Sequence, residues 1–299
     1  MADPPTYVLI TPARNEAQFL EQTIQSVVAQ SVRPLQWVIV SDGSTDGTDE
    51  IVKRYAARHP WIQLLRMPAR QERHFAGKVD AFNAGYALLR DLPYDVIGSL
   101  DGDISFGSDY FSFLLQKLAR NPRLGLVGTP FREGATGTYD YRFSSIEHVS
   151  GACQLFRRQC FEEIGGYVPI RGGGVDRFMV VSARMNGWKT RTFVERVCLH
   201  HRPMGTARQG VLKARYLAGI KDYVFGNHPL WELVRVVYQA TQRPAVVGAA
   251  ALASGYAWAL TRQIDRPVSP DFVTFTRNEQ LRRLRAFATR QRACHDIQT

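Results

Sequence analysis

The sequence predicts an α/β protein with a mostly parallel sheet flanked by helices, followed by an α-helical extension. Short apolar runs alternate with segments of helical periodicity in the first part of the chain, as in successive βαβ units. Beyond residue 205 the pattern turns helical and basic, so we place domains at 1–205 and 206–299. The 299 residues, 45% hydrophobic and 22% charged, suffice for a large core and argue against intrinsic disorder.

Strands are predicted at residues 7–10, 37–40, 62–65, 95–100, 124–129, 152–156 and 190–194, and several of them are apolar runs that end in polar turns. The predicted helices lie at residues 19–28, 50–58, 77–89, 110–119, 158–164 and 176–186. Pro12 is expected to end the first strand and to begin a loop. Ligands of such sheets bind beyond the carboxyl ends of the strands, and the polar clusters fall there.

The first of these clusters is Asp101-Gly102-Asp103, directly after an apolar strand. Two carboxylates at this spacing suit a hard divalent cation that bridges to phosphate oxygens. The alternative is a turn with two solvated aspartates.

Other polar residues at the same edge suit an anionic ligand. Asp42 could accept a hydrogen bond from a base or ribose, or cap a helix. In the loop that begins at Pro12 and Ala13, Arg14 suits a diphosphate and Glu16 is an acceptor, although this loop could also be a plain helix start. Lys78, near a helix N-terminus, also suits an anion.

Two further groups lie later in the chain. Asp176 follows three glycines, so it is either an N-cap or a general base on a hinged loop. His200-His201-Arg202 could supply a third metal ligand and a phosphate contact, with the choice between the two histidines open.

Together these pieces resemble the family 2 glycosyltransferases, which have the GT-A fold. The matching segments, in family order, are Thr11–Glu16, Ser41–Thr48, Gly77-Lys78 with Ala81, Asn83 and Gly85, Leu100–Asp103, Gly165–Tyr167, and Val175-Asp176 with Arg184 and Gly187-Trp188. The resemblance covers the first two thirds of the chain. The Asp-Gly-Ser-Thr-Asp-Gly-Thr run together with Asp-x-Asp is more specific than either motif alone.

The resemblance implies transfer of a sugar, with inversion, from a nucleotide-diphosphate sugar, most simply a UDP-sugar. It implies Mg²⁺ or Mn²⁺ at Asp103 with His200 or His201, and Asp176 as the base that deprotonates the acceptor hydroxyl. The donor would be bound by Pro12, Ala13, Arg14, Glu16, Asp42, Lys78, Asp101 and Gly102.

Two departures from the family pattern qualify this expectation. Val175 stands where the family usually has Glu. The Gln-x-x-Arg-Trp motif of processive synthases is absent after Asp176, which favours a single-addition enzyme. The acceptor is expected to be a lipid-linked or polysaccharide intermediate of the cell envelope. Arg73, residues 139–143 and the loop at Gly172 are expected to set specificity.

The positive charge is concentrated in the last third of the chain. Residues from His200 onward carry 15 Lys and Arg against 6 Asp and Glu, whereas Met1–Leu199 carry 23 against 21. The stretch 244–260 has no charged residue and is bordered by Arg243 and Arg262. We expect this tail to dock on an anionic membrane surface, and a buried helix or a dimer contact is the alternative. Nucleic acid is not expected as a partner, because no recognition motif accompanies the charge.

The N-terminus lacks the basic and apolar regions of a signal peptide, so the expected place is the cytoplasm, peripheral on the inner face of the membrane. The four cysteines show no spacing typical of a zinc site or a disulfide framework. Two rival functions are a sugar-phosphate nucleotidyltransferase and a non-catalytic module that binds membranes or polyanions. A nucleotidyltransferase would have a glycine-rich signature with Arg and Lys near the first strand, and this sequence lacks it. The presence of Asp101, Asp103 and Asp176 argues against a non-catalytic module.

Overall fold

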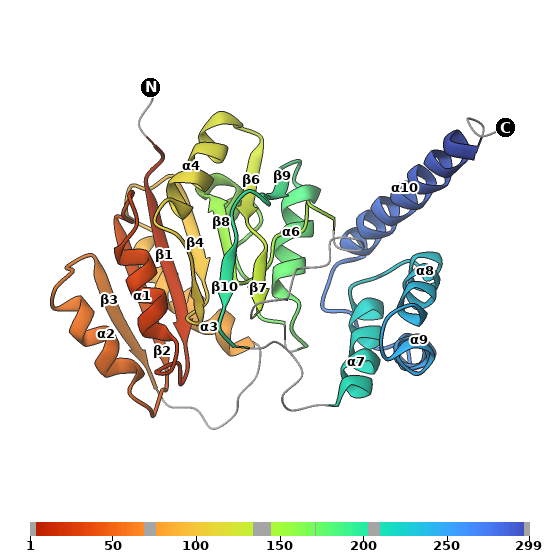
Figure 1. Cartoon of the computed structure of the whole chain (residues 1–299), viewed down its shortest axis with the longest axis horizontal. Coiled ribbons are helices and arrows are strands. Elements are labelled where there is room, and N and C mark those ends of the chain that lie inside the picture. The colour runs from red at the N-terminus through yellow and green to blue at the C-terminus, as the bar shows by residue number, and fades with distance from the viewer. Residues whose placement is uncertain (1–3, 69–75, 134–144, 171, 203–209, 296–299) are drawn as a thin grey trace. The chain divides into compact units, whose positions relative to one another are not determined.

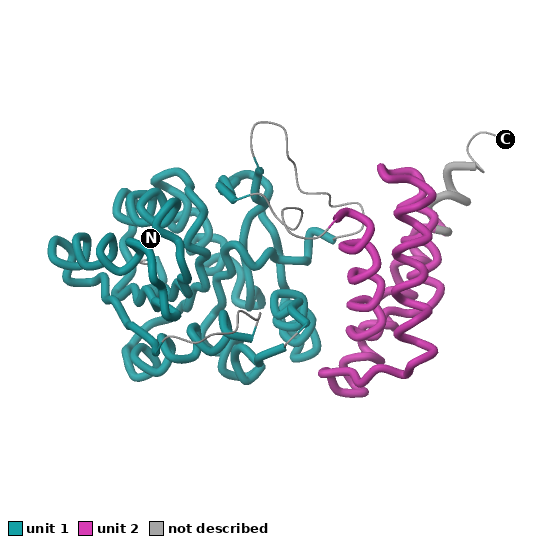
Figure 2. Tube along the Cα trace, turned by 90° about the horizontal axis from the view of Figure 1, so that it is seen from below, with its two compact units in different colours: residues 1–203 teal, residues 204–299 magenta. Residues whose placement is uncertain are grey.

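The computed structural model describes residues 4–68, 76–133, 145–170, 172–202 and 210–295. The chain forms two compact units, residues 1–203 and residues 204–299 (Figure 2). Each unit has its own secondary structure and is described separately.

The first unit is built on a seven-stranded sheet of order β3-β2-β1-β4-β8-β6-β9 (Figure 1). All its neighbouring strands are parallel except at β8, which runs antiparallel to β4 and β6. The mostly parallel α/β fold predicted from the sequence is therefore confirmed. The strands are β1 (Tyr7–Ala13), β2 (Gln36–Asp42), β3 (Ile62–Met67), β4 (Val96–Leu100), β6 (Leu124–Gly128), β8 (Cys153–Arg157) and β9 (Lys189–Thr192).

Helices cover both faces of this sheet, which is why its central strands are apolar throughout. Alternate strand residues enter two cores: Leu9 and Ile39 face one, Val8 and Val38 the other. The first core receives side chains of α1 (Leu20–Val28), α2 (Thr48–Ala56) and α4 (Tyr110–Arg120). The second receives side chains of α3 (Ala76–Leu89), α5 (Arg158–Glu163) and α6 (Val175–Met185).

A second, three-stranded sheet has the order β5-β10-β7, formed by β5 (Ile104–Ser105), β7 (Phe131–Glu133) and β10 (Cys198–His200). The sequence did not predict these strands, because two or three residues are too few to show a period. Their pairing has a functional consequence, since β10 sets His200 opposite Ile104, the residue after Asp103.

The end of β1 differs from the sequence prediction. Pro12 and Ala13 were expected in a loop, but they are the last residues of the strand and pair with Val40 and Ser41 of β2. The pairing of β1 with β4 ends at Ile10, so Pro12 has a strand neighbour on one side only. A strand tolerates proline at such a place because a missing N–H costs no ladder bond there.

Hydrogen bonds join the loop after β1 to the loop after β2. The backbone N–H of Asn15 donates to Ser44 Oγ at 3.1 Å, and the Asn15 side chain accepts from the Thr45 N–H at 2.8 Å. Asp46 accepts from the N–H groups of Ala17 and Thr48, each at 3.0 Å. The Asp-Gly-Ser-Thr-Asp-Gly-Thr run therefore holds together the two loops at the carboxyl ends of β1 and β2.

The second unit contains four described helices, α7 (Val211–Val224), α8 (Pro229–Ala240), α9 (Ala245–Thr261) and α10 (Pro270–His295). The helical C-terminal region is thus as predicted. Helices α7 and α9 cross in backbone contact: a Cβ on Gly219 would lie 2.0 Å from the Leu252 carbonyl oxygen, and one on Gly255 would lie 2.0 Å from that of Tyr216. Among the described residues, no helix is long and apolar enough to cross a membrane.

This crossing makes a stability prediction. Gly255→Ala would gain about 1 kcal/mol of helix propensity, but its methyl group cannot fit against a backbone carbonyl. We expect the steric clash to outweigh this gain. The free energy of unfolding of the second unit, measured by chemical denaturation, should fall by about 3 kcal/mol. Ser254→Ala, at an exposed position of the same helix, is the matched control and should change stability by less than about 0.5 kcal/mol. Equal stability of the two variants would show that the helices do not cross at this point.

Candidate active site

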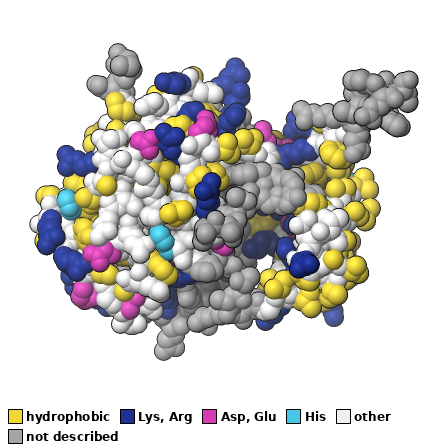
Figure 3. All heavy atoms as spheres, in the orientation of Figure 1, with side chains coloured by type: hydrophobic (Ala, Val, Ile, Leu, Met, Phe, Trp, Pro, Cys, Tyr) yellow, Lys and Arg dark blue, Asp and Glu magenta, His cyan; other side chains and the backbone are white. Residues whose placement is uncertain are grey.

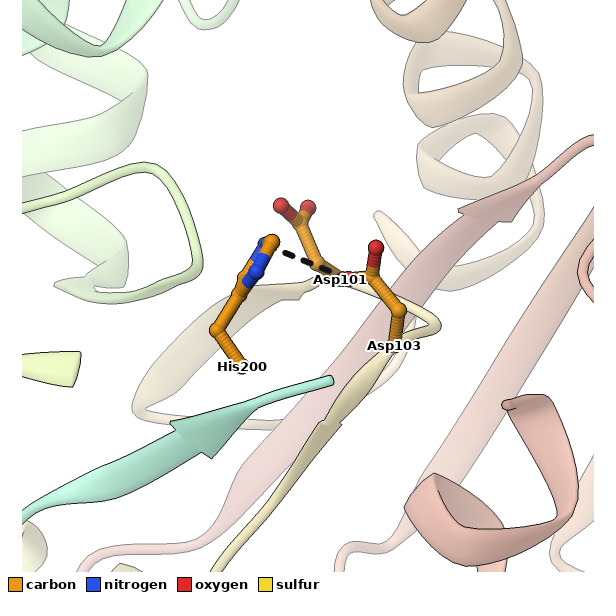
Figure 4. Close-up of side chains that lie close together, drawn as sticks. All are labelled: Asp101, Asp103 and His200. Carbon is orange, nitrogen blue, oxygen red and sulfur yellow. Dashed lines mark ion pairs between the residues drawn. The ribbon is translucent and has the colours of Figure 1, made fainter. Parts of the chain in front are cut away.

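Two carboxylates and an imidazole meet beyond the carboxyl end of β4. One potential ligand atom from each of Asp101, Asp103 and His200 lies within 4.8 Å of the others. Figure 4 shows the three side chains converging from the turn between β4 and β5 and from β10. His200 Nε2 is 3.6 Å from Asp103 Oδ1, and both side chains are largely buried.

The backbone fixes this cluster at two points. The Asp101 N–H donates to the Ala152 carbonyl at 2.9 Å, which continues the pairing of β4 with β8 past the strand end. The His201 N–H donates to the Asp103 carbonyl, also at 2.9 Å. Since both anchors are main-chain bonds, the site geometry depends on the two sheets more than on side-chain packing.

The structure separates the two histidines. His200 faces Asp103 and, through Nδ1, lies 3.9 Å from Glu133 Oε1. The His201 ring instead contacts Ser105 Oγ at 2.9 Å and stacks on Phe19 with centroids 6.2 Å apart. β10 ends at His200, and the next side chain points elsewhere, so of the two histidines only His200 is in the cluster with the carboxylates.

Basic side chains surround the cluster. Lys78, in the first turn of α3, forms an ion pair with Asp101. Arg202 forms an ion pair with Glu16 and places its Nε 3.7 Å from Asp103 Oδ2. Burial alone would lower the pKa of Lys78, but the Asp101 carboxylate, with smaller contributions from Asp103 and Asp176, raises it.

The pKa of Asp101, the acidic partner of Lys78, is also shifted by opposing effects. Burial raises the pKa of Asp101; Lys78 lowers it, and the nearby Asp103 carboxylate raises it again. Two carboxylates this close repel each other, so a cation between them is favourable.

The donor set fits a divalent cation. Carboxylate oxygens suit Mg²⁺ and Mn²⁺, and an imidazole is compatible with Mn²⁺. In the described part of the chain, the buried Nδ1 of His200 makes no hydrogen bond, and Glu133 lies close enough to orient the ring. Asp101, Asp103 and His200 are therefore the residues that would hold the metal.

The predicted donor-binding residues line the same edge. Asp42, the last residue of β2, is buried, and its Oδ2 lies 3.8 Å from Arg14 Nη1. A Cβ on Gly102 would lie 3.6 Å from Glu16 Cγ and 3.7 Å from Thr11 Cγ2, so the Asp-Gly-Asp turn packs against the end of β1. Glu16 links this wall to Arg202 on the other side.

Asp176 is in the first turn of α6 and does not act as its N-cap. Gly174 is the N-cap, with a φ of +89°, and no side chain caps this helix. The left-handed backbone there requires glycine. The Asp176 side chain packs against Gly151: a Cβ placed on Gly151 would lie 3.3 Å from the Cβ of Asp176. Since the carboxylate contributes to the pKa of Lys78, it lies in the same electrostatic neighbourhood as Asp101.

Sequence reasoning missed His148, whose Nε2 is 3.7 Å from Asp176 Oδ2. Its loop is held by two threonines of β9, because Thr190 Oγ1 donates to the Glu147 carbonyl and Thr192 Oγ1 donates to the His148 carbonyl, each at 2.5 Å. A lone histidine in a segment without periodicity gives no signal in the sequence. Arg73 and residues 139–143, expected to set specificity, lie outside the described residues.

Comparison with known families gives the same interpretation as the geometry. The profile of Glycosyl transferase family 2 matches residues 8–165, more than half of the chain. The chain belongs to this family. It is therefore a glycosyltransferase, and the site lies at the carboxyl edge of a GT-A sheet.

Among characterised relatives of this family 2 enzyme are bacterial polymer synthases. Poly-beta-1,6-N-acetyl-D-glucosamine synthase of Staphylococcus epidermidis is 23% identical over 198 residues, which cover 60% of this chain and 44% of the relative. The synthase of the same name from Staphylococcus aureus is 27% identical over 170 residues, covering 50% and 39%. The matches thus span less than half of these relatives.

Solved structures share the fold at low identity. The mannosyltransferase PcManGT from Pyrobaculum calidifontis, in complex with GDP-Man and Mn²⁺, is 22% identical with a TM-score of 0.58, covering 94% of this chain and 85% of its own. TarS 1–349 of S. aureus in complex with UDP-GlcNAc is 13% identical with a TM-score of 0.52, covering 86% and 73%.

Proposed function

We propose that this family 2 enzyme transfers one sugar, with inversion, from a nucleotide-diphosphate sugar to an acceptor hydroxyl, and that the reaction needs a divalent metal. The observation that carries the proposal is the convergence of Asp101, Asp103 and His200 beyond β4, with Lys78 beside them. That arrangement suits a ligand carrying a diphosphate. Two relatives of the same fold are described with GDP-Man and with UDP-GlcNAc.

The chain's own residues divide the work of binding the donor. Asp42 would hold the base and ribose at the end of β2, with Arg14 beside it facing the diphosphate, and Glu16 would keep Arg202 turned toward Asp103. Pro12, Ala13 and Gly102 supply the backbone wall. Mg²⁺ or Mn²⁺, bound by the aspartates and His200, would offset negative charge on the departing diphosphate. Lys78 and Arg202 would add fixed positive charge there.

Asp176 would act as the general base. It would accept the proton of the acceptor hydroxyl while the acceptor oxygen bonds to the anomeric carbon and the bond from that carbon to the phosphate oxygen breaks. One displacement inverts the configuration. His148 would keep the Asp176 carboxylate oriented. Val175 leaves this base without the acidic neighbour that the family usually has.

The proposed acceptor is a lipid-linked or polysaccharide intermediate of the cell envelope, and the proposed place of work is peripheral, on the inner face of the membrane. Similarity to poly-N-acetylglucosamine synthases supports a polysaccharide pathway, and the net positive charge of the second unit supports an anionic surface. The missing Gln-x-x-Arg-Trp motif supports single addition over polymerisation.

The experiment is release of nucleotide from a panel of UDP-, GDP- and dTDP-sugars, with Mn²⁺ or with EDTA. We expect one donor, with UDP the first candidate, to release its nucleoside diphosphate slowly and only with metal. Adding extracts that contain lipid-linked sugars should accelerate the release. Formation of a nucleoside triphosphate and a sugar 1-phosphate when pyrophosphate is added would instead identify a nucleotidyltransferase, and metal-independent release would contradict the proposal.

A further inference from the structure

Helix α8 has its charged side chains inside and its apolar ones outside. Leu230, Leu233, Val234 and Val237 follow the i, i+3, i+4, i+7 spacing of one helix face, and each is between 40% and 61% exposed. Glu232, on the opposite face, is only 3% exposed. A helix that serves only the core of a water-soluble unit shows the reverse arrangement.

The charged face of α8 is neutralised inside the unit. Arg235 forms an ion pair with Asp222 of α7 and lies 3.9 Å from Glu232 Oε2. Asn227 Nδ2 donates to Glu232 Oε2 at 3.3 Å, and Gln280 Nε2 of α10 donates to Asn227 Oδ1 at 2.6 Å. These contacts fix the orientation of α8 within the second unit, so its apolar face points to the surface.

Helix α9 also has two faces. Gly255 packs against α7, and Gly248 is buried against Gln239 of α8. The side chains between 44% and 73% exposed are Val246, Val247, Trp258 and Leu260. No charged residue occurs from Pro244 to Thr261, and exposed arginines, Arg243 and Arg262, stand at its two ends. In Figure 3 hydrophobic side chains gather on the surface of this unit.

Charge favours a lipid surface as the occupant over another protein. Residues 204–299 carry 14 Lys and Arg against 6 Asp and Glu, a net charge of +8. Two of those acids, Asp222 and Glu232, are buried and paired, so the outer surface is more basic than the count suggests. An apolar face with basic ends suits the interface of an anionic bilayer, where aliphatic side chains enter the acyl boundary and arginines meet phosphates.

We propose that the exposed apolar faces of α8 and α9 form one lipid-docking surface, which seats the enzyme on an anionic membrane without spanning it. Leu230, Leu233, Val234 and Val237 of α8 and Val246, Val247, Trp258 and Leu260 of α9 enter the bilayer interface. Arg243 and Arg262 bind lipid phosphates at its edge. The surface gives the proposed transfer a reason to use a lipid-linked acceptor, but it does not depend on that chemistry.

The test is sedimentation of the full chain with vesicles of phosphatidylcholine, with and without phosphatidylglycerol, at low salt. The variant Leu233→Gln/Val237→Gln removes apolar contact, and Arg243→Gln/Arg262→Gln removes charge. Leu35→Gln/Val194→Gln, at similarly exposed positions of the first unit, is the matched control. We expect the wild type and the control to bind vesicles containing phosphatidylglycerol, and both other variants to bind about tenfold or more weakly.

Several results would overturn the proposal. The wild type staying in solution with all vesicles would do so, as would undiminished binding by Leu233→Gln/Val237→Gln. A dimer that this variant dissociates, seen by light scattering without vesicle binding, would assign the face to a second copy. Because vesicle binding needs no nucleotide, it can fail while metal-dependent donor cleavage persists, and the reverse also holds. Thermal unfolding of each variant confirms that these exposed substitutions leave the fold intact.

Discussion

Asp176→Asn is expected to lower kcat for sugar transfer by about 10²–10⁴-fold, the usual contribution of a positioned general base. The amide keeps the size and shape of the carboxylate and its seat on Gly151, but it cannot take the acceptor proton. Binding of the donor should change little, because Asp176 is not part of the cluster formed by Asp101, Asp103 and His200. The measurement is kcat and KM for the donor identified in the panel, together with UDP affinity.

Asp91→Asn, a change of the same charge at a highly exposed position, is the matched control and should retain wild-type kcat. His148→Ala should lower kcat less than Asp176→Asn does, with His148→Gln recovering part of the loss because its amide can still donate to the carboxylate. Full activity of Asp176→Asn would remove it from the role of base. A large rise in donor KM at unchanged kcat would reassign it to binding.

Asp103→Ala is expected to raise the Mn²⁺ concentration for half-maximal activity by more than about 100-fold, so that little activity remains at the Mn²⁺ concentration that saturates the wild type. Loss of a direct ligand should exceed the 10–100-fold cost of losing an outer-shell partner. It also leaves Arg202 and His200 without the carboxylate that both face. A manganese titration of donor cleavage measures the effect.

The two histidines provide an internal control for this experiment. His200→Ala should weaken the dependence on Mn²⁺, because His200 faces the carboxylates. His201→Ala should leave it near the wild-type value, because the His201 ring contacts Ser105 and Phe19. If His201→Ala has the larger effect, the assignment of the metal ligands is wrong.

The sequence predicted the large sheet well because most of its central strands are apolar runs and several of its helices have a clear apolar face. Residues whose role follows from the end of such a strand, such as Asp42 and Asp101, could be placed at the site edge for the same reason. Pro12 was misplaced, because an edge position that tolerates proline depends on where the β4 pairing ends. That is information about tertiary structure.

The parts that could not be predicted depend on long-range pairing. The choice of His200 over His201 is made by the register of β10 against β5, two strands too short to leave a pattern. His148 lies beside Asp176 in a loop that hydrogen bonds from Thr190 and Thr192 hold, and these contacts join segments far apart in the sequence. The sequence of α8 shows one apolar face and one polar face. Which face turned inward was decided by the Arg235 network in three dimensions.

This site is expected to bind a nucleoside diphosphate through a divalent metal. The most direct test is thermal unfolding of the wild type with UDP, and with GDP in parallel, in Mn²⁺ and in EDTA. A nucleotide at about 100 times its dissociation constant stabilises the folded state by about 2.7 kcal/mol, which raises Tm by several degrees. We expect such a rise with Mn²⁺, none in EDTA and none for Asp103→Ala. A rise of equal size in EDTA, or no rise with either nucleotide, would contradict this expectation.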